Sequence, residues 1–260
     1  MALITLASVR SCGVTTLAIG LAATWPGDCR RLLVEADPAG GTLATQAGLG
    51  PEPGLVSLAA AARRQGDPSL AFDHVQCLPG EVLVVCGPPA SSRARSALSM
   101  LSGLLGRLDD LDELHAEVFC DCGRLDRTTD NVDLFERGRL AVLVSRPRLS
   151  DLNALAASLE ERAEQPRRPV LVLVGDGPYP AKEVAEVLGV EVAGHVPWDP
   201  DAAAAIGTAP ISSRQLTRTP LVRALRSLAG ALAERLAHEE AAVSPEPSAD
   251  GITPLAEVQR

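Results

Sequence analysis

Lysine is almost absent from this sequence. Lys182 is the single lysine among 260 residues, so nearly all of the positive charge comes from arginine. Aromatic residues are also scarce, at 2% of the chain. No apolar run approaches the roughly 20 residues that a membrane-spanning helix needs, which argues against a helical membrane protein. The net charge of -9 argues against a protein whose whole surface binds nucleic acid, because phosphate contacts need concentrated positive charge.

The first residues show no cleavable signal pattern and instead indicate a strand that runs into a polar loop. With no spanning run either, we expect a cytoplasmic protein. The cysteines are scattered without zinc-ligand spacing, so reduced thiols are expected at Cys12, Cys29, Cys77, Cys86, Cys120 and Cys122. Of these, Cys120 and Cys122 would point to one face of a strand as small core residues.

What the sequence does have is a regular alternation of apolar runs and helix-period segments. Runs rich in Val, Leu and Ala predict strands buried on both faces at residues 2–9, 31–36, 82–86, 117–122, 140–144, 170–174 and 190–196. Between them, a helical period marks residues 15–23, 93–111, 150–164, 180–188 and 220–239. This alternation is typical of an α/β protein with a doubly wound, mostly parallel sheet and helices on both faces.

Residues 1–239 are expected to form one domain, since a chain of this length with 46% hydrophobic residues suits one substantial core. Ser150 is a candidate cap for a helix that begins near Asp151, Pro180 suits a first helical turn, and Gly189 suits a helix end. Residues 240–260 turn polar and proline-bearing, which predicts a disordered tail.

The segment from Ala7 to Thr16, A-S-V-R-S-C-G-V-T-T, follows the first predicted strand and opens a helix. That is the setting of a phosphate-binding loop. In such a loop, small residues let backbone N–H groups converge on phosphate oxygens, while lysine neutralises the phosphate charge. Taken alone, one glycine with paired threonines is also compatible with an ordinary strand-to-helix turn.

This loop resembles the deviant Walker A loop of the ParA/MinD P-loop ATPases, whose pattern is K-G-G-V-G-K-T-T. Aligning the paired threonines places Val14 on the P-loop lysine and Val9 on the signature lysine. The resemblance covers about residues 1–237. It implies nucleotide contacts from Arg10, Ser11, Cys12, Gly13, Val14, Thr15 and Thr16.

Three further segments resemble motifs of the same family. Residues 33–41, L-V-E-A-D-P-A-G-G, resemble the second-strand motif, in which the aspartate at Asp37 positions the attacking water. Residues 118–123, V-F-C-D-C-G, resemble the Walker B strand, so Asp121 and Thr15 would hold magnesium. A Pro-Gly turn and a capping aspartate are the respective alternatives. Residues 196–205 resemble the family's late strand and loop beside the adenine pocket. The same resemblance puts the family's adenine-selecting asparagine near Gly175 or Asp176.

The missing lysines set the functional expectation. Two lost charge-assisted contacts, at roughly 1.5 to 3 kcal/mol each, predict weak binding of ATP or ADP with magnesium, or no cofactor at all. Hydrolysis should suffer more, because the lost charges also stabilise the transition state. The leading hypothesis is a pseudo-ATPase that organises protein partners as a scaffold or regulator. By resemblance, it would serve chromosome partitioning, cell division, or pilus or secretion assembly, and a homodimer is one implied assembly.

A second hypothesis is an atypical active ATPase that acts as a nucleotide-dependent dimer switch, with Arg10 or a partner residue replacing the lysines. The tyrosine-kinase branch of the superfamily is disfavoured, because Tyr179 is the only tyrosine. Nucleic-acid binding would be confined to a local arginine patch at Arg218, Arg223 and Arg226, for which a solvated helix face is the alternative.

Overall fold

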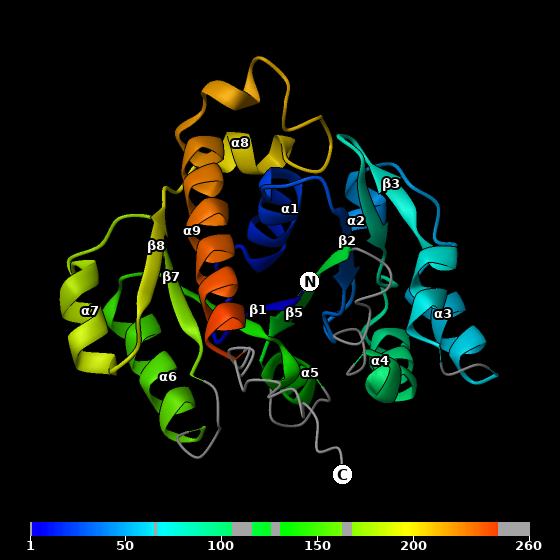
Figure 1. Ribbon diagram of the computed structural model, residues 1–260, viewed down its shortest axis with the longest axis horizontal. Coiled ribbons are helices and arrows are strands. Elements are labelled where there is room, and N and C mark those ends of the chain that lie inside the picture. The colour runs from blue at the N-terminus through cyan, green and yellow to red at the C-terminus, as the bar shows by residue number, and fades with distance from the viewer. Residues whose placement is uncertain (1, 65–66, 106–115, 126–130, 163–167, 244–260) are drawn as a thin grey trace, which may run out of the picture.

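The computed structural model describes residues 2–64, 67–105, 116–125, 131–162 and 168–243. Within these residues, eight strands form one sheet in the order β3-β4-β2-β5-β1-β6-β7-β8. The pairs are parallel except for β3 and β4, which run antiparallel. Helices cover both faces (Figure 1). The chain is an α/β protein with a doubly wound, mostly parallel sheet, as the alternation of apolar runs predicts.

Seven of the eight described strands form where the apolar runs predict them. The strands are β1 (Leu3–Ser8), β2 (Arg30–Glu35), β3 (Gln76–Leu78), β4 (Val82–Val85), β5 (Ala116–Arg124), β6 (Leu140–Ser145), β7 (Val170–Val174) and β8 (Val192–Val196). The sequence pattern does not predict β3, because three residues at a sheet edge are too few to show a period. Cys120 and Cys122 on β5 are both fully buried in one core cluster, which confirms that they share a face.

One face of the sheet is covered by α1 (Val14–Thr24) and α9 (Pro220–Val243), which pack against each other (Figure 1). Gly20 lies at their contact, where an added Cβ would lie 2.5 Å from Cδ1 of Leu225 and would force that side chain to shift. Helix α9 continues to Val243, so the domain end expected at residue 239 falls inside the helix. The predicted tail from residue 244 onward lies outside the described residues.

The opposite face carries α3 (Leu55–Ala62), α4 (Ser91–Leu105), α5 (Asn131–Arg137), α6 (Leu149–Glu160) and α7 (Ala181–Leu188). The expected cap at Ser150 is wrong, because α6 already begins at Leu149 with Arg148 in the N-cap position and no side-chain cap. The expected end of α7 at Gly189 is confirmed, with φ of 63° in the left-handed region. Of the helix predicted at residues 93–111, residues 106–111 lie outside the described residues.

Short helices escape prediction from the sequence because one or two turns give no measurable period. They are α2 (Leu43–Gln46), α8 (Pro200–Ala205) and the 3₁₀ segments η1 (Pro68–His74) and η3 (Leu216–Arg218). Helix α8 begins at a proline, and the Asp199 carboxylate accepts a hydrogen bond from the N–H of Ala202. In the part of the chain that the structure describes, no helix is both long enough and apolar enough to cross a membrane.

Candidate functional site

The predicted phosphate loop lies at the carboxyl edge of the sheet, where α/β proteins bind their ligands. It joins β1, which runs between β5 and β6, to α1. Gly13 stands directly before α1 with φ of 98°, a left-handed conformation that glycine adopts without strain. No side chain caps α1, and its first turn holds no acidic residue. The first N–H groups of α1 are therefore not satisfied by a side-chain cap.

Three polar side chains from different elements meet beside this loop. The Thr15 hydroxyl at the start of α1 donates to Oδ2 of Asp121 on β5, at 2.5 Å. The backbone N–H of Gly123 donates to the other oxygen of Asp121, at 2.9 Å. A Cβ added to Gly123 would lie 2.1 Å from Cγ of Asp37, so the Asp37 carboxyl rests against the same turn. The structure thus brings together Thr15, Asp37 and Asp121, whose proximity the sequence motifs predict.

The carboxyl groups of this cluster are held in an environment that disfavours their charge. Burial raises the pKa of Asp121 to about 7, although hydrogen bonds from Thr15 and Gly123 act in the opposite direction. Burial also raises the pKa of Asp37, opposed by the N–H of Ala39 and the charge of Arg124. Burial therefore makes both carboxyl groups easier to protonate than they would be in water.

Glu35, at the end of β2, is a buried carboxylate that the sequence analysis did not single out. Its Oε1 accepts hydrogen bonds from the N–H groups of Thr42 at 2.6 Å and Leu43 at 3.1 Å. Its Oε2 accepts from the N–H of Gly87 at 2.9 Å. The side chain is 2% exposed, and burial raises its pKa while these three N–H groups lower it. Glu35 thereby ties the far end of the turn that carries Asp37 to Gly87, in the segment after β4.

We expect Glu35→Gln to lower the free energy of unfolding by about 1 to 3 kcal/mol. In the wild type both carboxylate oxygens accept hydrogen bonds from backbone N–H groups, whereas the glutamine NH₂ group would face one of these donors and could not accept from it. Chemical denaturation at neutral pH measures this loss, and Glu183→Gln on the exposed surface of α7 is the matched control. Equal losses for the two variants would show that the three hydrogen bonds contribute nothing specific.

The two positions aligned with the family lysines hold valines that pack in or against the apolar core. Val14 is 5% exposed and belongs to the core cluster under α1 and α9. Val9 is half-buried and packs against the core cluster on the opposite face. Of the other loop residues, Arg10 and Ser11 are exposed, and Cys12 is buried with its thiol donating to the carbonyl of Val144 at 3.2 Å. Val9 and Val14 therefore place apolar side chains where the family pattern has lysine.

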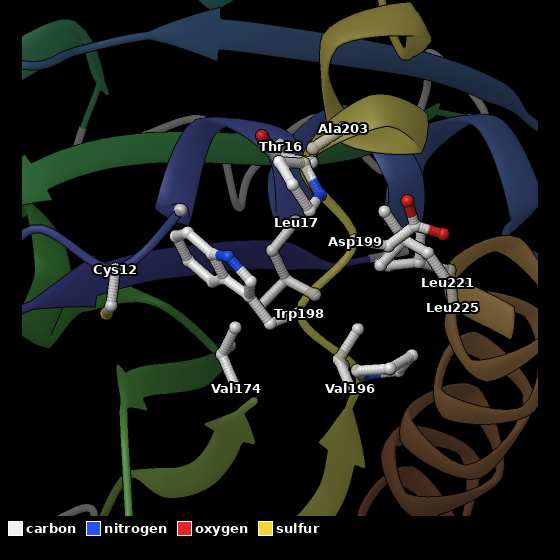
Figure 2. A pocket seen from close by; sticks show the side chains of 13 residues that line it. Cys12, Thr16, Leu17, Val174, Val196, Trp198, Asp199, Ala203, Leu221 and Leu225 are labelled. Carbon is white, nitrogen blue, oxygen red and sulfur yellow. The ribbon is translucent and has the colours of Figure 1, made fainter. Parts of the chain in front are cut away.

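An apolar cavity of about 100 Å³ opens beside the loop. Figure 2 shows Cys12 and Trp198 on one side of it, Thr16 and Leu17 of α1 behind, and Leu221 and Leu225 of α9 on the other side. Trp198 is 57% exposed. Gly175, near the expected base-selecting position, packs under this residue, since an added Cβ would lie 3.1 Å from Cβ of Trp198. Asp176 is exposed and does not line the cavity.

The residues present fit magnesium better than they fit a triphosphate. The hydroxyl of Thr15 and the carboxylate of Asp121 are hard oxygen donors placed side by side, which suits a magnesium ion that keeps most of its water. A triphosphate would meet these carboxylates with valine at both lysine positions. Among the described residues, no group of three or more His, Cys, Asp or Glu side chains is arranged to hold a metal ion by itself.

Comparison with known proteins gives matches in structure alone. No protein-family model matches the chain, and no curated protein matches it significantly. The chain is similar to a ParA family ATPase from Chlorobium tepidum, with 18% identity, a TM-score of 0.72, and coverage of 88% of this chain and 97% of that one.

Two MinD structures are also similar. MinD from Pyrococcus horikoshii, complexed with Mg-ADP, shows 18% identity, a TM-score of 0.69, and coverage of 92% of this chain and 98% of that one. The MinC:MinD complex of Aquifex aeolicus shows 14% identity, a TM-score of 0.64, and coverage of 90% and 96%. Identities this low carry the fold alone: the chain has the α/β P-loop NTPase fold of the ParA and MinD ATPases.

Proposed function

We propose that this protein is a ParA/MinD-like pseudo-ATPase, a non-hydrolysing scaffold or regulator that works in subcellular positioning through protein partners. Its structural neighbours include a ParA family ATPase and cell-division MinD proteins. Chromosome partitioning, cell division, and pilus or secretion assembly are the processes in which we place it. The magnesium-binding pair Thr15 and Asp121 and the water-positioning Asp37 are retained in this proposal as vestigial groups.

The observation that carries this proposal is the burial of Val14. A P-loop lysine is useful because its ammonium group reaches the phosphates and stabilises the charge that develops during transfer. Val14 instead packs into the core at 5% exposure, so this position holds an apolar core residue and no cation. Val9, at the position of the signature lysine, also carries no charge, so the carboxyl groups of Asp37 and Asp121 have no lysine partner from this loop. Triphosphate binding should be weak, and turnover should be lost.

A protein partner, and a homodimer as one assembly, are parts of the same proposal. The neighbouring MinD of Aquifex aeolicus was solved together with MinC, which is a precedent for a partner on this fold. MinD of Pyrococcus horikoshii was solved with Mg-ADP, which supports a test of ADP as well as ATP. A cytoplasmic location completes the proposal.

The proposal predicts that the purified protein hydrolyses ATP with magnesium no faster than its Asp37→Ala variant. Removal of the carboxylate should change nothing, because the charges needed in the transition state are already missing. Phosphate release, followed over hours at saturating ATP, measures this rate, and the mass in solution with and without nucleotide reports any dimer switch. Hydrolysis that Asp37→Ala abolishes would overturn the pseudo-ATPase and favour the atypical ATPase. An Arg10→Ala variant would then show whether Arg10 supplies the missing charge.

A further inference from the structure

Arg146 contacts Trp198, which lines the loop cavity, although Arg146 is far from the loop in sequence. It follows β6, which pairs with β1, so its backbone emerges at the same edge of the sheet as the phosphate loop. The hydrogen bond from the thiol of Cys12 to the carbonyl of Val144 ties the loop to the end of β6. Burial raises the pKa of Cys12 to about 11, while the charge of Arg146 acts on this thiol in the opposite direction.

The guanidinium of Arg146 is held over an aromatic ring and has no anionic partner within the described residues. Its Cζ stands 4.6 Å from the centroid of the Trp198 ring, in a cation–π contact. Its Nε is buried, and this atom donates no hydrogen bond to the described part of the chain. A partly buried guanidinium is costly until an anion pairs with it. The arrangement is therefore prepared for a negatively charged group that arrives from outside.

We propose that Arg146 is the anion-binding residue of this site, and that with Trp198 and the backbone at Cys12 and Gly13 it binds a nucleoside phosphate. A guanidinium pairs with phosphate through its planar fork, and the exposed face of Trp198 can stack on a base. This assignment rests on the proposed function and deepens it: the site holds nucleotide through a cation directly after β6, without the lysines that turnover needs.

Arg10 and Arg124 also lie near the loop, but neither is held over an aromatic ring of the cavity lining in the described structure. Arg10 is exposed and makes no hydrogen bond or ion pair with the described residues, so nothing holds its side chain toward the cavity. The charge of Arg124 acts on Asp37, which places it on the side of the acidic cluster. Arg146 alone of the three contacts a residue that lines the cavity. The cation that contacts the cavity lining therefore follows β6 and does not belong to the loop itself.

Titration of ADP without magnesium, followed by tryptophan fluorescence, tests this assignment. The chain has two tryptophans, and Trp25 is buried at 4% exposure while Trp198 is 57% exposed, so the signal reports on the cavity. We expect saturable binding of ADP to the wild-type protein and a dissociation constant at least about tenfold larger for Arg146→Gln, since a charge-assisted hydrogen bond is lost. Affinity for adenosine, which has no phosphate, should be the same in both proteins.

Arg148→Gln, an exposed arginine two residues further along, is the matched control and should bind ADP as the wild type does. If Arg146→Gln fails to fold, Arg146→Lys keeps the charge without the fork and should show an intermediate loss. The assignment is overturned if the wild type does not bind ADP, if Arg146→Gln binds equally well, or if only Arg10→Gln weakens binding. Phosphate release from ATP tests the pseudo-ATPase separately, because hydrolysis would overturn that function whichever arginine binds ADP.

Discussion

Replacing Val14 by lysine, which restores the family residue, is expected to lower the free energy of unfolding by about 3 kcal/mol or more. Val14 is 5% exposed and lies in the cluster that α1 forms with α9 and the sheet. A lysine there must bury its ammonium group or push apart the surrounding side chains, and both are costly. We therefore expect no recovery of ATP hydrolysis from this single substitution. Chemical denaturation and a phosphate-release assay measure the two effects.

Val14→Met separates size from charge, because methionine is long and flexible but apolar. It should cost about 1 to 3 kcal/mol through overpacking, less than the lysine variant. The opposite result would be a lysine variant as stable as the wild type at neutral pH. The new ammonium group would then reach the carboxyl groups of Asp37 and Asp121. The loop would in that case keep the shape of a phosphate-binding loop and lack only the lysine charge. The pseudo-ATPase proposal would lose its main support.

The fold could be predicted from the sequence because its parallel strands are buried on both faces. Such a strand shows as a nearly continuous apolar run, and the runs at β6 and β7 need no tertiary information to be recognised. The short edge strand β3 gives no such signal, since its stability comes from pairing with β4. The cap at Ser150 failed for a related reason: serine is common both before a helix and in its first turn, and local sequence does not separate the two.

The candidate site divides in the same way. Thr15, Asp37 and Asp121 lie in short motifs at the ends of strands, so their motifs alone suggest that they meet. Glu35 lies inside one of these motifs, yet its role depends on the N–H of Gly87, which is 52 residues away. Arg146 is further still from the loop, and only the sheet order places β6 beside β1. Residues that act across the sheet edge need the topology before they can be found.

The acidic cluster carries the second large expected effect, which concerns pH. Asp121 is fully buried, and its folded pKa of about 7 is well above the value of roughly 3.9 expected in the unfolded chain. Between these two values the folded protein holds a proton that the unfolded chain has lost, so stability falls as the pH rises through this window. Below the window both states are protonated, and above it the full penalty is present. The shift corresponds to about 4 kcal/mol.

Asp121→Asn removes this penalty while keeping an oxygen that accepts from the N–H of Gly123 and an amide that donates to the hydroxyl of Thr15. We expect the variant to be more stable than the wild type by up to about 4 kcal/mol near pH 8 and equal to it near pH 4. Denaturation curves across this range measure the difference, and Asp176→Asn in the exposed loop after β7 is the control. A wild type whose stability relative to Asp121→Asn does not fall with pH would mean that a cation neutralises Asp121 at neutral pH. The carboxyl group would then be part of a working metal site, and the pseudo-ATPase proposal would have to be abandoned.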